Sequence, residues 1–132
     1  GKFKFNLKIG CPKKYAPGKK ILGWAKKNKV NLLITQKPDE AVKNSDCVMT
    51  DKRVSMNDKV NKKTKKKVLK PFQVNKKLMK KANSNAIFMH CLPVGRGEEV
   101  TDEVIDGKQS VVWRQALNRV HAQKSIIKWC LD

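Results

Sequence analysis

The chain has 132 residues, a length typical of one domain, and 39% of them are hydrophobic, enough for one core. No apolar run approaches the roughly 20 residues of a membrane-spanning helix. The formal net charge is +20, from 31 Lys and Arg against 11 Asp and Glu. Such a charge would attract nucleic acid through its phosphates, or it reflects a solvated lysine-rich surface. Arginine and aromatic residues are scarce in the densest lysine stretch, 58–81, which disfavours base reading and stacking.

The N-terminus lacks the apolar core and cleavage site of a signal peptide. The four cysteines have no C-x-x-C spacing, which disfavours both a zinc site and a secreted disulfide scaffold. We therefore expect reduced thiols in a cytoplasmic protein, with no metal and no cofactor. Because the sequence opens without Met and directly on a strand pattern, we also expect a fragment of a longer protein.

Apolar patterning in the first half of the chain predicts alternating strands and helices. The expected strands cover residues 5–9, 30–35 and 47–50. A helix is expected to begin at Pro17 and a shorter one at Pro38, because proline suits the first helical position.

The second half continues this alternation after a polar, lysine-rich loop expected at about 52–66. A helix is expected from Pro71, followed by a strand at 86–89, a turn capped by Thr101, and a long helix over 112–131. The residues expected to point inward from the Pro71 helix are Phe72, Val74, Leu78 and Ala82. The order predicts a single α/β domain, residues 1–132, with a parallel sheet of about four strands and helices on both faces.

A polar, reactive pair follows the strand at 86–89. His90 and Cys91 stand where the strand leaves the core, and Pro93 prevents further pairing. Ligands of open parallel sheets bind beyond the carboxyl ends of the strands, so this pair is a candidate site. The alternative is that Cys91 is a small buried hydrophobe and His90 a satisfied loop residue.

A second polar strand end follows residues 47–50, with Asp51 and then Ser55. In a parallel sheet both ends fall on one edge, so a carboxylate, a hydroxyl and a thiol would face one crevice. Arg119, on the last helix, could reach an anionic ligand there. Each residue also has an ordinary alternative role: Asp51 as a turn former, Ser55 as a loop hydroxyl and Arg119 as a solvated helix charge.

Together these segments resemble the second half of ornithine carbamoyltransferase. The resemblance rests on Asp51 with Ser55-Met56, on His90-Cys91-Leu92-Pro93 and on Asn118-Arg119, and it covers nearly the whole chain. Cys91 distinguishes this family from the sister aspartate carbamoyltransferases, which resemble this segment but carry Pro there.

The resemblance implies a Rossmann-like domain that takes part in arginine biosynthesis as a transferase. Asp51 would hold the α-amino group of L-ornithine, while Ser55 and Met56 would close over the amino-acid end. Cys91 would lie near the δ-amine, and the backbone of Cys91 and Leu92 would contact the carbamoyl group. Arg119 would polarise the carbamoyl carbonyl oxygen. The products would be L-citrulline and phosphate.

The family's N-terminal domain supplies a Ser-Thr-Arg-Thr-Arg phosphate cradle and a His-Pro-x-Gln segment, and neither occurs in this sequence. The central first strand of the family's second domain is missing as well. The remaining strands must therefore close the gap, pair with another molecule or gain a substitute. Three positions also depart from the family: Arg53 stands in place of Trp, Arg114 in place of a common acid, and Leu117 in place of the Glu that often precedes Asn118-Arg119.

These observations leave three hypotheses. The first is an ornithine-binding half-enzyme, inactive alone, with carbamoyl phosphate bound mainly by the absent domain. The second is a non-catalytic fragment or engineered scaffold of the same fold, and the third is a basic nucleic-acid-binding module. The family is homotrimeric, but its trimer contacts lie largely in the absent half, so we expect this chain to be a monomer or a strand-paired dimer. We expect no membrane association.

Overall fold

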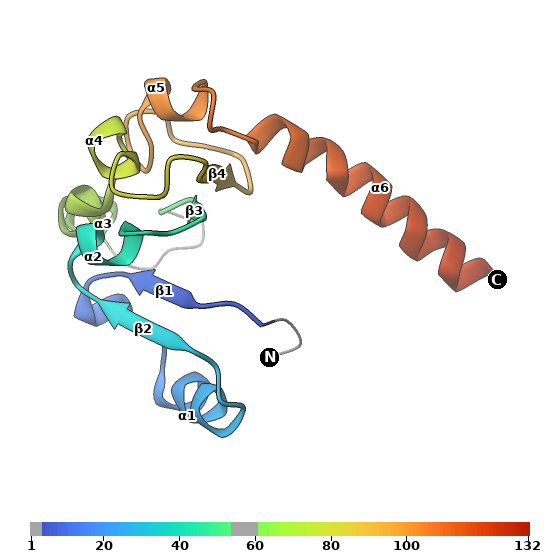
Figure 1. Ribbon diagram of the computed structural model, residues 1–132, viewed down its shortest axis with the longest axis horizontal. Coiled ribbons are helices and arrows are strands. Elements are labelled where there is room, and N and C mark those ends of the chain that lie inside the picture. Colours follow the sequence, from blue (N-terminus) through green and yellow to red (C-terminus); the bar gives the residue numbers. More distant parts are fainter. Residues whose placement is uncertain (1–3, 54–60) are drawn as a thin grey trace.

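The computed structural model describes residues 4–53 and 61–132. Its elements alternate between strands and helices, as the sequence predicts (Figure 1). In the first part these are β1 (Leu7–Gly10), the 3-10 turn η1 (Lys13–Tyr15), α1 (Lys19–Lys27), β2 (Leu32–Thr35), α2 (Pro38–Val42) and β3 (Cys47–Thr50). They are followed by α3 (Lys62–Leu69), the 3-10 turn η2 (Lys70–Phe72), α4 (Lys76–Met79), β4 (Ile87–His90), α5 (Asp102–Ile105) and α6 (Val112–Leu131).

The strands pair in parallel, which confirms the α/β fold class, but they do not form one sheet. Within the described residues β1 pairs only with β2, and β3 pairs only with β4. The registers align Ile9 with Ile34 in one pair and Thr50 with His90 in the other. The prediction of a single sheet of about four strands is therefore wrong. The gap expected from the missing central strand is not closed, because within the described residues neither β1 nor β2 pairs with β3 or β4.

The hydrophobic core lies around β3 and β4. Phe88, at the centre of β4, is fully buried, and it is surrounded by apolar residues of α2, α4, α5 and the start of α6. The buried members of this cluster are Val42, Val48, Val74, Leu78, Met79, Phe88, Val100, Val104, Ile105 and Val112. By contrast, Leu33 of β2 and Ile21 and Trp24 of α1 are exposed. The β1–β2 half thus has much less apolar cover than the β3–β4 half.

Helix α2 joins the two halves. It contacts both β1 and β2, and it also contacts α4 of the core. At its closest approach, a Cβ placed on Gly10 would lie 2.9 Å from the Cβ of Ala41, so the strand can approach the helix only because position 10 is glycine.

Asparagine caps account for two differences from the predicted elements. The Asn61 side chain accepts a hydrogen bond from Lys63 N, so α3 begins inside the predicted loop. The single helix predicted from Pro71 is divided into η2 and α4, because the Asn75 side chain accepts from Leu78 N and starts a new helix there.

Two predicted helix starts are also wrong in detail. The first helix begins at Lys19 with Gly18 as its N-cap, rather than at Pro17. Thr101 does occupy the N-cap position of α5, but its side chain makes no capping hydrogen bond.

The last helix, α6, has the predicted bounds and extends away from the rest of the molecule (Figure 1). Of its residues only Val112 is buried, and near its end Trp129 and Leu131 are 80% and 82% exposed. Within the described residues, no helix has both the length and the apolar character that crossing a membrane requires.

Candidate functional site

The carboxyl ends of β3 and β4 lie side by side, because Thr50 and His90 are partners in the parallel register. The next residue of each strand, Asp51 and Cys91, is therefore delivered to the same edge. The Cys91 thiol donates a hydrogen bond to Asp51 Oδ1 over 2.8 Å. The structure thus brings together the carboxylate and the thiol that the sequence singled out. Cys91 is exposed, so it is not the buried hydrophobe of the alternative interpretation.

This contact shifts the two acid–base equilibria in opposite directions. The hydrogen bond from Cys91, followed by that from the Lys52 backbone N–H at 2.6 Å, lowers the pKa of Asp51. The same hydrogen bond to Asp51, with burial and the charge of Asp51, raises the pKa of Cys91. At neutral pH the pair is therefore a charged carboxylate beside a protonated thiol, which suits recognition of an ammonium group.

Arg119 contributes positive charge to the same region from α6. Its charge acts on the Cys91 thiol and lowers that pKa, against the larger effect of Asp51. The helix is held at this edge by the side chain of Gln115, whose Oε1 accepts a hydrogen bond from His90 N at 3.1 Å. Carboxylate, thiol and guanidinium thus come from three separate parts of the chain.

Of the other predicted site residues, the structure describes only Leu92. Ser55 and Met56 lie outside the described residues. Leu92 is half-buried with a φ of 53°, its N–H donates to His90 Nδ1 at 3.0 Å, and the Leu92–Pro93 peptide is cis.

A buried pair lies behind the site, and of its two residues the sequence singled out His90 but not Glu99. His90 and Glu99 are 1% and 0% exposed, and His90 Nε2 lies 3.6 Å from Glu99 Oε1. His90 Nδ1 accepts the Leu92 N–H, and the opposite ring nitrogen, Nε2, is the one that lies near the carboxylate, without a hydrogen bond to it. The imidazole therefore lies between the backbone of the Cys91-Leu92 turn and a buried acid.

The Glu99 carboxylate also organises the turn that follows Pro93. It accepts a hydrogen bond from Gly95 N and lies 3.8 Å from Lys52 Nζ. Nothing in the residue type signals this role, because an acid next to Glu98 in a charged stretch usually faces solvent.

The three departures from the family pattern do not all lie on one element. Arg53, half-buried, donates from Nη1 to Leu69 O at 2.7 Å and so ties the end of β3 to the end of α3. Arg114 and Leu117 are both exposed on α6. The structure gives no reason why leucine replaces an acid at position 117.

A comparison with protein-family models matches residues 1–130 to the aspartate/ornithine carbamoyltransferase family, Asp/Orn binding domain. The chain is 52% identical over 129 residues to an ornithine carbamoyltransferase of Rhodopseudomonas palustris (strain BisA53). This match covers 98% of the chain but 41% of that relative. An enzyme of the same name from Bradyrhizobium diazoefficiens is 52% identical, with 99% of the chain and 42% of the relative covered.

Solved structures give the same result. The ornithine carbamoyltransferase of Pyrococcus furiosus superposes with a TM-score of 0.82 at 42% identity, covering 92% of this chain and 40% of that one. The anabolic enzyme of Campylobacter jejuni gives a TM-score of 0.87 at 33% identity, with 95% and 43% covered. The chain thus spans less than half the length of these relatives, and the similarity extends to its Rossmann-like fold.

Proposed function

Because the chain belongs to the aspartate/ornithine carbamoyltransferase family, we propose that it supplies the ornithine-binding half of an ornithine carbamoyltransferase. The observation that carries the proposal is the Cys91–Asp51 hydrogen bond at the ends of β3 and β4. It gathers two of the side chains that the family resemblance assigns to the amino-acid substrate. The site therefore takes L-ornithine in preference to nucleic acid.

In this proposal the charged Asp51 carboxylate binds the α-ammonium group of ornithine. A lowered pKa suits this role, because the carboxylate keeps its charge throughout the neutral range. The protonated thiol of Cys91 lies beside the δ-amine, and the backbone of Cys91 and Leu92 contacts the carbamoyl group. The buried His90–Glu99 pair supports that backbone from behind.

The reaction is attack of the neutral δ-amine on the carbonyl carbon of carbamoyl phosphate. A C–N bond forms, the C–O bond to phosphate breaks with its electron pair leaving on phosphate, and the amine loses a proton. A free alkyl amine has a pKa near roughly 10.4, so the neutral form must be selected or generated on binding. Negative charge develops on the carbonyl oxygen, and the guanidinium of Arg119 stabilises it.

The whole enzyme's activity, part of arginine biosynthesis, requires more than this chain. The chain covers 41% of the R. palustris relative, and it contains neither family motif for the phosphate of carbamoyl phosphate. We therefore expect it to bind ornithine without forming citrulline.

Isothermal titration calorimetry with L-ornithine tests the proposal. The expected result is saturable heat that is lost in Asp51→Ala and retained in Asp46→Ala, which removes a carboxylate at the other end of β3. Absence of saturable heat from a folded wild-type chain would identify it as a non-binding fragment of the fold. Citrulline production by the chain alone would contradict the proposal that this chain binds ornithine but needs the rest of the enzyme for the reaction.

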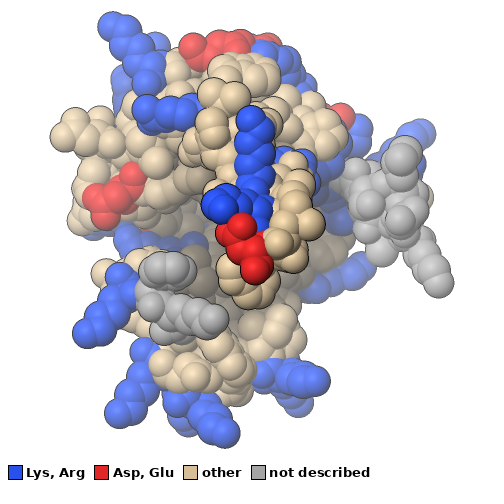
Figure 2. Space-filling view, turned by 90° about the vertical axis from the view of Figure 1, so that its right-hand side faces the viewer, with Lys and Arg blue, Asp and Glu red and all other residues tan. Residues whose placement is uncertain are grey.

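The nucleic-acid alternative gains no specific support from the surface. Lys and Arg side chains are distributed over the whole visible face in Figure 2, rather than gathered into one stripe. DNA binding that weakens steeply with salt would favour that alternative.

A further inference from the structure

Two adjoining cavities lie along α3, at the end of the molecule opposite to the free end of α6 (Figure 1). The first has a volume of about 320 Å³ and reaches from the C-terminal half of the helix to Gln73 and Gly97. The second has a volume of about 310 Å³ and lies at the start of the helix. Lys66 and Glu98 line both cavities, so we treat the two together as one surface, the α3 basin.

Positive charge dominates the α3 basin. Its described lining includes one acid, Glu98, whose carboxylate already forms an ion pair with Lys66 Nζ at 2.5 Å. Among the residues that the structure describes, Lys67 and Lys70 have no acidic partner. A concave surface lined by charges of one sign concentrates counter-ions, so the basin favours an anion. The cations that line it are Lys52, Arg53, Lys62, Lys63, Lys66, Lys67 and Lys70.

The positions of these lysines along α3 argue against a role in helix stability alone. Lysines in the last turn of a helix oppose the partial negative charge there, which accounts for Lys66 and Lys67. Lys62 and Lys63, however, begin the helix, where the partial charge is positive and the first turn contains no acid. A bound anion would offset this unfavourable arrangement.

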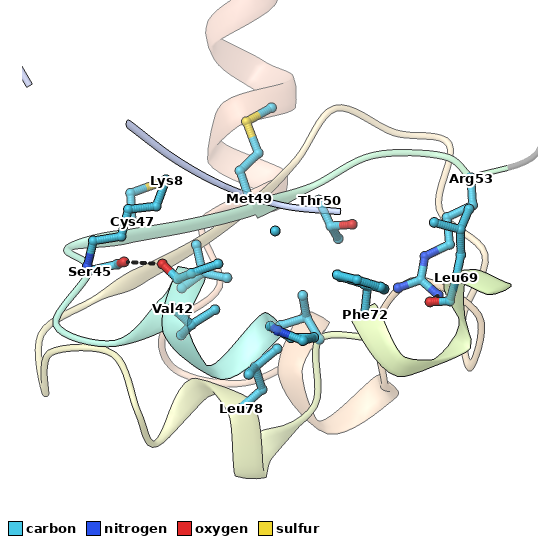
Figure 3. A pocket seen from close by; sticks show the side chains of 15 residues that line it. Lys8, Val42, Ser45, Cys47, Met49, Thr50, Arg53, Leu69, Phe72 and Leu78 are labelled. Atoms are coloured by element: carbon cyan, nitrogen blue, oxygen red, sulfur yellow. Dashed lines mark hydrogen bonds between the residues drawn. The ribbon is translucent and has the colours of Figure 1, made fainter. Parts of the chain in front are cut away.

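Arg53 distinguishes the basin from an ordinary run of surface lysines. Its side chain is half-buried beside Leu69 (Figure 3), whose carbonyl oxygen accepts a hydrogen bond from Nη1 at 2.7 Å. Nη2 is buried and makes no hydrogen bond to any described residue. Burial lowers the pKa of Arg53, and the charges of Glu99 and Glu98 oppose this effect only in part. A cation that is partly removed from water and incompletely compensated is stabilised by a nearby anion.

The same residue separates the basin from the substrate site of the family. The family resemblance leads us to expect Trp at position 53, so the arginine is a feature of this chain. A planar guanidinium suits phosphate oxygens better than it suits most other anions. The chemistry of the basin therefore favours a phosphate ligand.

The length of the basin indicates what kind of phosphate ligand it takes. An α-helix of 8 residues, such as α3, is about 12 Å long, so one phosphate cannot contact the cations at both of its ends. A chain of linked phosphates can. No aromatic side chain is among the described residues that line either cavity, so nucleic acid bases would find no stacking partner there.

We propose that the α3 basin binds a short chain of linked phosphates, the group that inorganic polyphosphate and nucleoside triphosphates share. The chain lies along α3, with its charges distributed between the two cavities. Lys66 is released from Glu98 to contact it, because this lysine stands between them. The inference does not depend on ornithine binding, since its residues are not those assigned to ornithine.

Isothermal titration calorimetry of the full chain with sodium tripolyphosphate tests the proposal. The expected result is saturable binding of one tripolyphosphate, about tenfold or more tighter than that of orthophosphate at the same ionic strength and weaker at higher salt. Adenosine triphosphate is the second probe. Tighter binding of this nucleotide would identify a nucleoside triphosphate as the ligand, and equal or weaker binding would identify inorganic polyphosphate; both results support a phosphate-chain site.

A pair of double variants separates the basin from the general charge of the protein. Lys67→Gln with Lys70→Gln should weaken tripolyphosphate binding about fivefold or more, because two cations of the first cavity are lost. Lys26→Gln with Lys27→Gln, at exposed positions of α1, is the matched control. Each double variant loses two positive charges, but the control should change the affinity less than about twofold.

Removal of the acid in the basin should have the opposite effect. Glu98→Gln frees Lys66 and removes a repulsive charge, so tripolyphosphate should bind about twofold to fivefold more tightly. Glu40→Gln is the matched control, because Glu40 also forms an exposed ion pair with a lysine, Lys37, at 3.0 Å. It should leave the affinity unchanged. Circular dichroism verifies that each variant is folded.

Three results would overturn the inference. The first is that the folded chain does not bind tripolyphosphate, and the second is that both double variants weaken binding equally, as a diffuse positive surface would. The third is that a single-stranded thymidine oligonucleotide binds more tightly than tripolyphosphate and is weakened by the same lysine substitutions, since the basin would then be a nucleic-acid site. Calorimetry with ornithine is a separate readout, so a failure here leaves the proposed function untouched.

Discussion

The thiol of Cys91 donates a hydrogen bond to Oδ1 of Asp51 over 2.8 Å, although the two residues are 40 positions apart in the chain. The contact exists because β3 and β4 pair in parallel and end together, with Thr50 opposite His90. It couples the charge of a carboxylate to the reactivity of a thiol, which makes the site accessible to simple chemical measurements.

The first prediction concerns the rate at which iodoacetamide alkylates Cys91. Only the thiolate reacts, and Asp51 raises the pKa of this thiol. In Asp51→Asn the rate at pH 7.5–8 should rise several-fold, because the carboxylate charge is removed and an amide oxygen accepts the hydrogen bond from the thiol more weakly than a charged carboxylate does. Peptide mapping by mass spectrometry measures the rate at each cysteine. Cys130, free and exposed on α6, serves as the internal control and should not change.

Arg119 should affect the same thiol in the opposite direction. Its charge lowers the pKa of Cys91, so Arg119→Ala should slow alkylation of Cys91 at a given pH. The change should be smaller than that caused by Asp51→Asn, because Arg119 is the weakest of the influences on this thiol. Arg114→Ala, on the same helix, is the control. An equal effect of the two substitutions would show that Arg119 does not lie near the thiol.

The turn after α5 should not tolerate a side chain at Gly107. A Cβ there would lie 2.6 Å from the backbone oxygen of Glu103. Gly107→Ala should destabilise the fold by about 1–3 kcal/mol, the usual cost of overpacking. Gly23→Ala in α1 has open space and should instead stabilise by roughly 0.4–1 kcal/mol. Urea denaturation of both variants makes the comparison.

Stability should fall in acid. The pKa values of Glu40, Asp51, Glu98 and Asp106 are all lowered in the folded chain, each chiefly by a hydrogen bond to a partner. A lowered folded pKa gives stability that is present above the unfolded pKa, about 4, and is lost as pH falls through the folded value. The free energy of unfolding should therefore decrease below about pH 4–5.

Arg96 allows part of this acid dependence to be assigned. Its guanidinium donates to both Oδ1 and Oδ2 of Asp106 and is the main cause of that carboxyl's lowered pKa. In Arg96→Ala the dependence of stability on acid pH should be shallower than in the wild-type chain. If the free energy of unfolding of Arg96→Ala depended on acid pH as steeply as that of the wild-type chain, Asp106 would not be paired in solution.

The sequence predicted the elements that carry strong local signals. Residues 47–50 form β3 as expected, and α6 has the expected bounds, because long periodic or short fully apolar runs leave little choice of structure. The strand ends then placed Asp51 and Cys91 together. The N-caps at Asn61 and Asn75 were not predicted, and they determine where α3 and α4 begin.

Two features could not be predicted from local patterns. Burial of Glu99 beside His90 depends on a turn that folds back from Gly95, and no periodicity reveals such a contact. The division into two half-sheets depends on a strand that the described chain does not supply. Strand pairing is a long-range property, so the pattern of β1 and β2 was correct while the sheet inferred from it was not.

The most direct test of the central claim is protection of Cys91 by L-ornithine. The account predicts that ornithine slows alkylation of Cys91 in a saturable way, leaves Cys130 unaffected, and gives no protection in Asp51→Ala. If ornithine slows both thiols equally or neither of them, the carboxylate and thiol at the ends of β3 and β4 do not form an amino-acid site with Arg119 of α6.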